Sequence, residues 1–221
     1  MPRTRHTEPI PLVLYEDPLS PWCLVAERRV RAAMDDLAGG FALTLASFPT
    51  RVDDDRAMSR GELRELARSA RKAAKEPEAA GTVPDLWLSR DPPLTSLPAL
   101  NALAAARLQG KSHEAALRAA IREAALFRGL NVSRTDVLLE LAERAGLDLA
   151  HFSGALVAPA TARRVRESVD EAIDRGIRGA PALVIADEWL VAGARPADEY
   201  RTILRRYTRS RLGLAPRRTL H

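Results

Sequence analysis

The order of strand-like and helix-like segments limits the fold of this chain more than any other feature. Residues 11–15, "PLVLY", form a short apolar run that is typical of a buried strand. The pattern is helical from 21 to 38, where two glycines end it, and residues 41–48, "FALTLASF", place alternate apolar side chains on one face. Strand, helix and strand in this order predict a βαβ unit with a right-handed crossover.

The middle of the chain has only helical signals. Residues 60–75, "RGELRELARSARKAAK", predict a charged amphipathic helix, and a loop punctuated by prolines follows it. Further helices are predicted at 96–109, 112–128, 134–145 and 148–156, with Ser112 as the N-cap of the second. We therefore expect a helical block inserted into the chain.

Strand signals return near the end of the chain. In "PALVIADEWLVAG" two apolar runs flank Asp187 and Glu188, which predicts a hairpin of 182–186 and 189–192. Pro196 suits the first turn of a last helix. The whole order predicts an α/β, thioredoxin-like βαβ…ββα fold with a large helical insertion. The expected parts are a thioredoxin-like domain (10–58 and 165–209), the insertion (59–164) and a basic C-terminal tail (210–221).

Composition excludes several classes of protein. At 221 residues and 46% hydrophobic content, the chain suits one globular core or one domain carrying an insertion. Much of the net charge of +5 lies in the final "RRYTRSRLGLAPRRTLH", which lacks a nucleic-acid reader motif, so we expect a solvated tail and no specific nucleic-acid partner. No apolar run is long enough for a membrane helix or a signal peptide, so we expect no membrane partner and a cytoplasmic location.

Few residues are candidates for chemistry. Cys23 is the single cysteine, so the chain cannot form an internal disulfide. The four histidines lie far apart without acidic ligand spacing, which favours surface or capping roles over a metal site: His6, His113, His151 and His221. Asp53, Asp54 and Asp55 are expected to be solvated, and Trp87 and Trp189 to belong to the core. We expect no metal and no tightly bound cofactor.

Three segments resemble the DsbA-like thiol oxidoreductases. Strand-then-"DPLSPWC", residues 17–23, resembles the strand-then-"CPWC" motif of that family. Residues 176–200, "GIRGAPALVIADEWLVAGARPADEY", are similar to its later hairpin segment, above all in the FrnE-like branch. Residues 125–148, "ALFRGLNVSRTDVLLELAERAGLD", resemble the helical insertion of that branch. The resemblance implies a thiol-disulfide oxidoreductase that acts on a peptide, a protein or glutathione.

The resemblance also implies a site. Ser20 and Cys23 take the two cysteine positions, and a cis Pro181 would face them as a third catalytic residue. Pro21, Trp22 and Ala180 would bind substrate, because a cis bond at Pro181 leaves the Ala180 backbone free to pair with an extended peptide. In a Cys-x-x-Cys motif at a helix N-terminus the first sulfur is the exposed nucleophile, and here that position holds serine.

Three alternatives follow from this serine. The protein can be a monothiol relative of the oxidoreductases, with Cys23 either reactive or buried. It can use Ser20 to activate glutathione as a thiol co-substrate, which resembles the kappa-class glutathione transferases and 2-hydroxychromene-2-carboxylate isomerases; Arg178 or Arg195 would then bind the carboxylates. It can also be a non-catalytic peptide-binding module or an inactivated variant. The sequence leaves the oligomeric state open.

Overall fold

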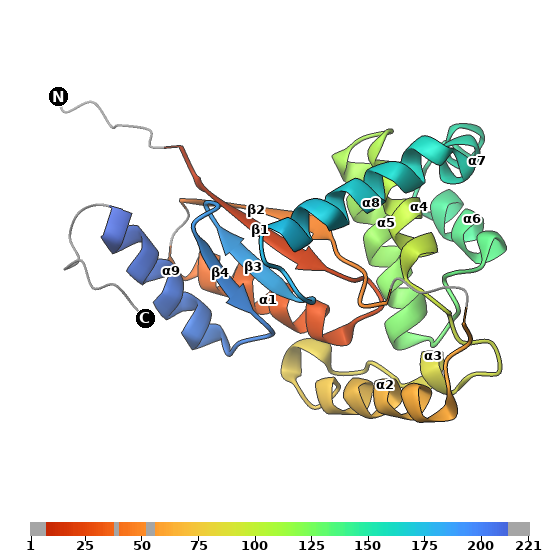
Figure 1. Cartoon of the computed structure of the whole chain (residues 1–221), viewed down its shortest axis with the longest axis horizontal. Coiled ribbons are helices and arrows are strands. Elements are labelled where there is room, and N and C mark those ends of the chain that lie inside the picture. The colour runs from red at the N-terminus through yellow and green to blue at the C-terminus, as the bar shows by residue number, and fades with distance from the viewer. Residues whose placement is uncertain (1–7, 38–39, 52–55, 212–221) are drawn as a thin grey trace.

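A mixed four-stranded sheet forms the centre of the computed structural model, which describes residues 8–37, 40–51 and 56–211 (Figure 1). The strand order is β2 (Phe41–Ser47), β1 (Ile10–Glu16), β3 (Ala182–Ile185) and β4 (Trp189–Ala192). β1 and β2 are parallel, whereas β1 with β3 and β3 with β4 are antiparallel. With a helix between β1 and β2 and another after β4, this is the predicted α/β thioredoxin-like fold.

One face of the sheet is covered by α1 (Pro21–Asp35) and α9 (Ala197–Arg211), which lie side by side in Figure 1. Leu12 and Leu14 point to this face from β1 because alternate residues of a strand share a face. They pack with Val30 of α1 and with Leu204 and Tyr207 of α9 in one buried cluster. α1 is thereby fixed against the sheet, and its N-terminus lies where β1 ends.

The opposite face is covered by α8 (Pro159–Asp174), a helix of 16 residues that sequence analysis missed. Val169 and Ala172 pack on the sheet with Tyr15 of β1, while Val165, one turn earlier, belongs to the core of the helical insertion. The predicted boundary between residues 164 and 165 therefore falls inside one continuous helix that serves both cores.

The insertion is helical, as predicted, but several details differ. The loop after α2 (Arg60–Ala73) contains two short helices, and the predicted helix 112–128 is α5 (Lys111–Arg122) followed by the π-helical turn η2. Gly110, not Ser112, is the N-cap of α5, so the Ser112 prediction is wrong. The other elements are η1 (Pro77–Ala79), α3 (Asp85–Leu88), α4 (Leu97–Arg107), η2 (Glu123–Phe127), α6 (Thr135–Arg144) and α7 (Leu149–Val157).

A buried ionic network joins the insertion to the thioredoxin-like part. Glu16, at the end of β1, is fully buried and bonds both Arg118 and Arg122 of α5; the Arg122 Nη2 to Glu16 Oε2 distance is 2.9 Å. Arg122 also pairs with Glu27 of α1. Since buried charges are stable only when they are paired and hydrogen-bonded, this network fixes α5 against the strand that leads into the site.

Candidate functional site

Ser20 lies at the N-terminus of α1, where unpaired helix N–H groups and the helix dipole favour negative charge. It is the N-cap, with an extended backbone (φ −97°, ψ 113°), and Pro21 takes the first helical position. Its side chain makes no capping hydrogen bond to the helix and is only half-buried. A half-buried hydroxyl therefore stands at the N-terminus of α1, at the position that the family resemblance assigns to the first sulfur.

Cys23 lies one turn further into α1 and is completely buried. The backbone N–H of Asp17 donates a hydrogen bond to its Sγ at 3.4 Å. Burial raises the pKa of the Cys23 thiol to about 12, and the hydrogen bonds from Asp17 and from the Ser20 side chain offset only part of this effect. The single thiol of the chain is thus protonated and inaccessible at neutral pH.

The Ala180–Pro181 segment faces Ser20 across a pocket of about 300 Å³. The peptide bond between Ala180 and Pro181 is cis, the isomer that the resemblance implied. Ser20, Pro21, Trp22, Ala180 and Pro181 all line this pocket, together with parts of α2, Trp87 and the loop after β4. The structure brings these predicted site residues together and leaves Cys23 behind the pocket wall.

Trp22 joins the site to the insertion. Its indole Nε1–H donates a hydrogen bond to Ser69 Oγ of α2 at 3.1 Å, and its ring lines the pocket beside Ser20. Trp22 therefore both covers the start of α1 and contacts the space that a ligand would occupy.

Asp17 is a structural residue of the site that sequence analysis missed. It is fully buried, and Oδ1 accepts a hydrogen bond from the Leu19 N–H at 2.9 Å. Oδ2 accepts from the N–H and the hydroxyl of Thr50 and from the hydroxyl of Ser96, each at 2.7 Å. One carboxylate thus holds the turn before Ser20 against the loop after β2 and the start of α4. An acidic residue directly after a buried strand was the only signal in the sequence.

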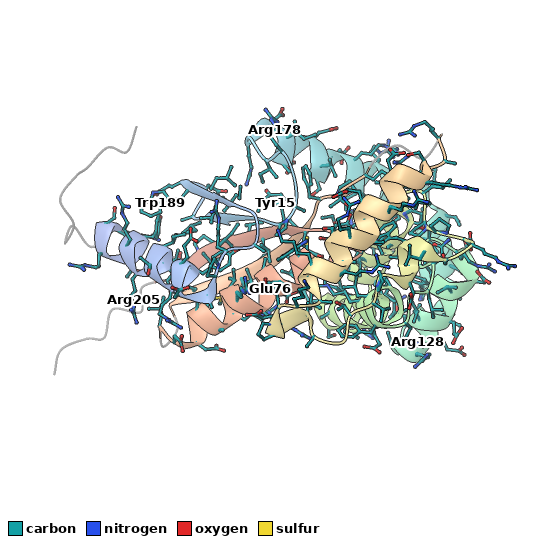
Figure 2. All side chains as sticks on the ribbon, turned by 90° about the horizontal axis from the view of Figure 1, so that it is seen from below. Tyr15, Glu76, Arg128, Arg178, Trp189 and Arg205 are labelled. Carbon is teal, nitrogen blue, oxygen red and sulfur yellow. The ribbon has the colours of Figure 1, made fainter. Side chains whose placement is uncertain are left out.

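Those lining residues of the pocket at Ser20 that fall within the described part of the chain are all uncharged. Arg178 and Arg195, the predicted partners of a ligand carboxylate, do not line it. Arg195 Nε donates to the Ala192 carbonyl at 2.9 Å, and Arg178 Nη1 donates to the Ile173 carbonyl at the same distance. Figure 2 shows Arg178 at the outer edge of the molecule.

The remaining candidates within the described ranges provide no titratable or metal-binding group to this site. Among the described residues, no group of three or more His, Cys, Asp or Glu side chains could hold a metal. His113 contacts the Gln109 carbonyl and His151 is exposed, whereas His6, His221 and Asp53 to Asp55 lie outside the described residues. Trp87 and Trp189 are half-buried at the margins of core clusters rather than inside them. Within the described ranges, every helix is too short or too polar to cross a membrane.

Comparisons with known proteins identify the family and support the fold. The family described as "DSBA-like thioredoxin domain" matches residues 12–205. A curated relative, the ClpXP adapter protein SpxH of Bacillus subtilis, is 25% identical over 205 residues, which cover 89% of this chain and 67% of the relative.

Solved structures share the fold. A putative protein disulfide isomerase from Nitrosomonas europaea has a TM-score of 0.74 at 18% identity and covers 92% of this chain and 99% of its own. The cytosolic disulfide reductase DsbM from Pseudomonas aeruginosa, solved with GSH, has a TM-score of 0.66 at 22% identity, with 90% and 99% covered. A 2-hydroxychromene-2-carboxylate isomerase has a TM-score of 0.63 at 18% identity, with 93% and 100% covered. With its family match over most of the sequence and its thioredoxin-like site, the chain belongs to the DSBA-like thioredoxin domain family.

Proposed function

We propose that this protein acts on thiols or disulfides whose sulfur lies beside the Ser20 hydroxyl, and that the reacting sulfur belongs to the ligand. One observation carries the proposal: the pocket at the N-terminus of α1 presents a hydroxyl, while the only cysteine of the chain, Cys23, is buried behind it. The family indicates that the reaction involves thiols or disulfides. Because position 20 holds a serine in place of a cysteine, the protein cannot supply the first sulfur of that reaction itself.

Cys23 is a poor candidate for the nucleophile. Thiol–disulfide exchange requires a thiolate with access to the substrate, and this thiol has neither charge at neutral pH nor exposure. A dithiol cycle also needs a second cysteine, which the sequence lacks. The monothiol alternative that uses Cys23 is therefore not the function that the geometry supports best.

Ser20 suits the stabilisation of a ligand thiolate. Its hydroxyl and the N-terminus of α1 both favour a negative charge in the pocket, and together they are expected to lower the pKa of a bound thiol by about 1 to 2 units. The ligand thiolate then attacks a disulfide of a second molecule: a new S–S bond forms, the old one breaks, and the leaving thiolate takes a proton from water. No resident cofactor is required.

The ligand backbone has a partner opposite Ser20. Ala180 lines the pocket, and its backbone can pair there with an extended peptide or with glutathione. Free thiols are maintained in a reducing compartment, so a cytoplasmic location is part of this proposal.

Ultraviolet absorbance of the thiolate tests the proposal directly. Blocked N-acetylcysteine methylamide and glutathione are titrated into the protein at a series of pH values. Because the pKa of Cys23 is about 12, the protein itself contributes no thiolate signal near neutral pH. We expect saturable binding of at least one compound with a lowered thiol pKa, loss of that shift in Ser20→Ala, and no change in Ser153→Ala, which alters a serine of α7 remote from the pocket.

Either of two results contradicts the proposal. The first is the absence of saturable binding by any thiol or disulfide at millimolar concentration. The second is an equal pKa of the bound thiol in wild type and in Ser20→Ala, since the hydroxyl would then have no part in stabilising the thiolate.

A further inference from the structure

β2 forms one edge of the central sheet. It is bonded to β1 along one side, and no strand of the described residues lies along its other side. Proteins usually protect such an edge with a charged residue, with a proline or by keeping the strand very short. β2 is seven residues long, and its sequence, "FALTLAS", contains neither a charged residue nor a proline. β4, at the opposite edge, has only four residues, so β2 is the longer of the two edges.

The main chain of β2 has unused hydrogen-bonding groups along this edge. Directly after the strand, the Phe48 N–H donates to the Glu16 carbonyl of β1 at 2.9 Å. In a parallel ladder every second residue bonds to the same neighbouring strand, so Phe48 defines which residues of β2 face β1. Leu43, Leu45 and Ser47 accordingly direct their N–H and C=O groups away from β1, and no described residue bonds to these groups. They can pair with an extended chain.

A crevice of about 250 Å³ lies beside the second half of this edge. Residues 44–47 of β2 line one side of it, and α4, the start of α5 and α8 line the rest. Leu103, Ala104 and Val165 provide apolar surface there. Among the described residues, none lines both this crevice and the pocket at Ser20, so the two are separate surfaces.

The crevice carries an excess of positive charge. Glu114 is already neutralised, because it forms ion pairs with Arg107 at 2.8 Å and with Arg118 at 2.6 Å. Arg164 of α8 is exposed and forms no ion pair with any described residue. The hydroxyl of Ser168, one turn further along α8, also lines the crevice. A guanidinium binds a carboxylate through two parallel hydrogen bonds, so an unpaired arginine beside the strand edge favours an acidic ligand.

We infer that this crevice is a docking site for an acidic, extended segment of a partner protein. The segment lies beside β2 as a further strand: its main chain pairs with Leu45 and Ser47, and an aspartate or glutamate side chain pairs with Arg164. Its apolar side chains pack on Leu103 and Val165. A second copy of this chain suits the crevice less well, because pairing β2 with β2 would bring an unpaired arginine from each copy to the same junction. The inference is independent of the proposed function, since it concerns a partner and not the thiol reaction.

The test uses blocked, fluorescently labelled peptides that alternate threonine and valine and contain one glutamate, which is moved through the sequence. Affinity is measured by fluorescence anisotropy at low salt concentration. We expect saturable binding for at least one glutamate position, and lysine in place of that glutamate should weaken binding about 10- to 100-fold. Methylation of every second peptide nitrogen should abolish binding in one of the two alternating sets and not in the other, because strand pairing uses alternate N–H groups.

A charge reversal on α8 tests the ionic contact. Arg164→Glu should weaken binding of the glutamate peptide at least about 10-fold and strengthen binding of the lysine peptide. Arg163→Glu is the matched control, because Arg163 is the neighbouring exposed arginine of α8 and does not line the crevice. Both substitutions change the net charge equally, so a difference between them reports the local contact.

Amide hydrogen exchange locates the bound peptide. The N–H groups of Leu45 and Ser47 should exchange more slowly when the peptide is bound, because they gain hydrogen bonds. Thr44 and Ala46, which face β1 in the ladder, are the internal control and should change little.

Four results overturn the inference. One is the absence of saturable binding by any acidic peptide at millimolar concentration. Another is equal binding in Arg164→Glu and Arg163→Glu, which removes the ionic contact. A third is binding that leaves exchange at Leu45 and Ser47 unchanged, which places the peptide elsewhere. The fourth is a dimer of the protein alone that slows exchange at these two amides, which assigns the edge to a second copy.

Discussion

The reactivity of Cys23 tests the structure most directly. Alkylation by iodoacetamide requires the thiolate, and burial raises the pKa of this thiol from 9.0 to about 12. At about pH 8, a thiol with a pKa of 9.0 is roughly one-tenth ionised, whereas Cys23 is ionised to about one part in ten thousand. The native protein should therefore react at least about a thousand-fold more slowly than the unfolded chain, before the lack of access is counted.

Mass spectrometry of the intact protein provides the measurement. The native protein should remain unmodified over a period in which the chain unfolded in guanidinium is fully alkylated. Ser20→Cys is the positive control, because its new thiol occupies a half-buried position at the N-terminus of α1 and should react in the native state. One label before unfolding and two after it are expected for that variant when it has first been fully reduced.

The raised pKa also predicts how stability depends on pH. The folded protein holds the Cys23 proton more tightly than the unfolded chain, so this contribution is fully present below about pH 9 and is lost as pH rises toward 12. Cys23→Ala should lack this loss of stability when urea unfolding of the two proteins is compared at alkaline pH.

The alkylation experiment can refute this description of the thiol. If Cys23 in the native protein is alkylated at a rate within about tenfold of the rate in the unfolded chain, the description of Cys23 as a buried and protonated residue is wrong.

Two further predictions concern residues beside this thiol. Ser20→Cys should form a reversible disulfide with Cys23 and, once reduced and freed of added thiol, should reduce insulin disulfides. Wild type without added thiol should match the buffer blank, and activity of wild type under that condition would contradict this prediction. Asp17→Ala leaves the four donors at Leu19, Thr50 and Ser96 without their carboxylate and should lower the free energy of unfolding by about 3 to 5 kcal/mol in urea titrations, and a loss below about 1 kcal/mol would show that water replaces those bonds.

The strands and their connecting helices were predictable because local patterns determine them. Leu12 and Leu14 alternate toward α1 and α9, and the positions of β3 and β4 follow from two apolar runs around a polar turn. α8 was missed although Pro159 at its start and Val165, Val169 and Ala172 at helical spacing indicate it. Its apolar stripe is divided between two cores, which makes it less regular than a stripe that packs on one.

The polar interior of the protein could not be predicted from local patterns. Glu16 and Arg122 are separated by 106 positions, and each alone reads as an ordinary surface charge. The same holds for Asp17 and Ser96, whose contact depends on how the insertion packs. Ser20 and Pro181 could be identified as site residues only through the family resemblance. They are far apart in the sequence, and only the complete fold brings them to the same pocket.

The network of Glu16, Glu27, Arg118 and Arg122 also decides which parts of this protein can be exchanged. The helical insertion carries both arginines, whereas the strand and helix of the thioredoxin-like part carry the two acids. A chimera that transplants the insertion onto a relative without an acid at the end of β1 would remove the fully buried counterion that Arg118 and Arg122 share. When domains are exchanged between relatives, these four residues should therefore be transferred together, although two of them lie in the thioredoxin-like part and two in the insertion.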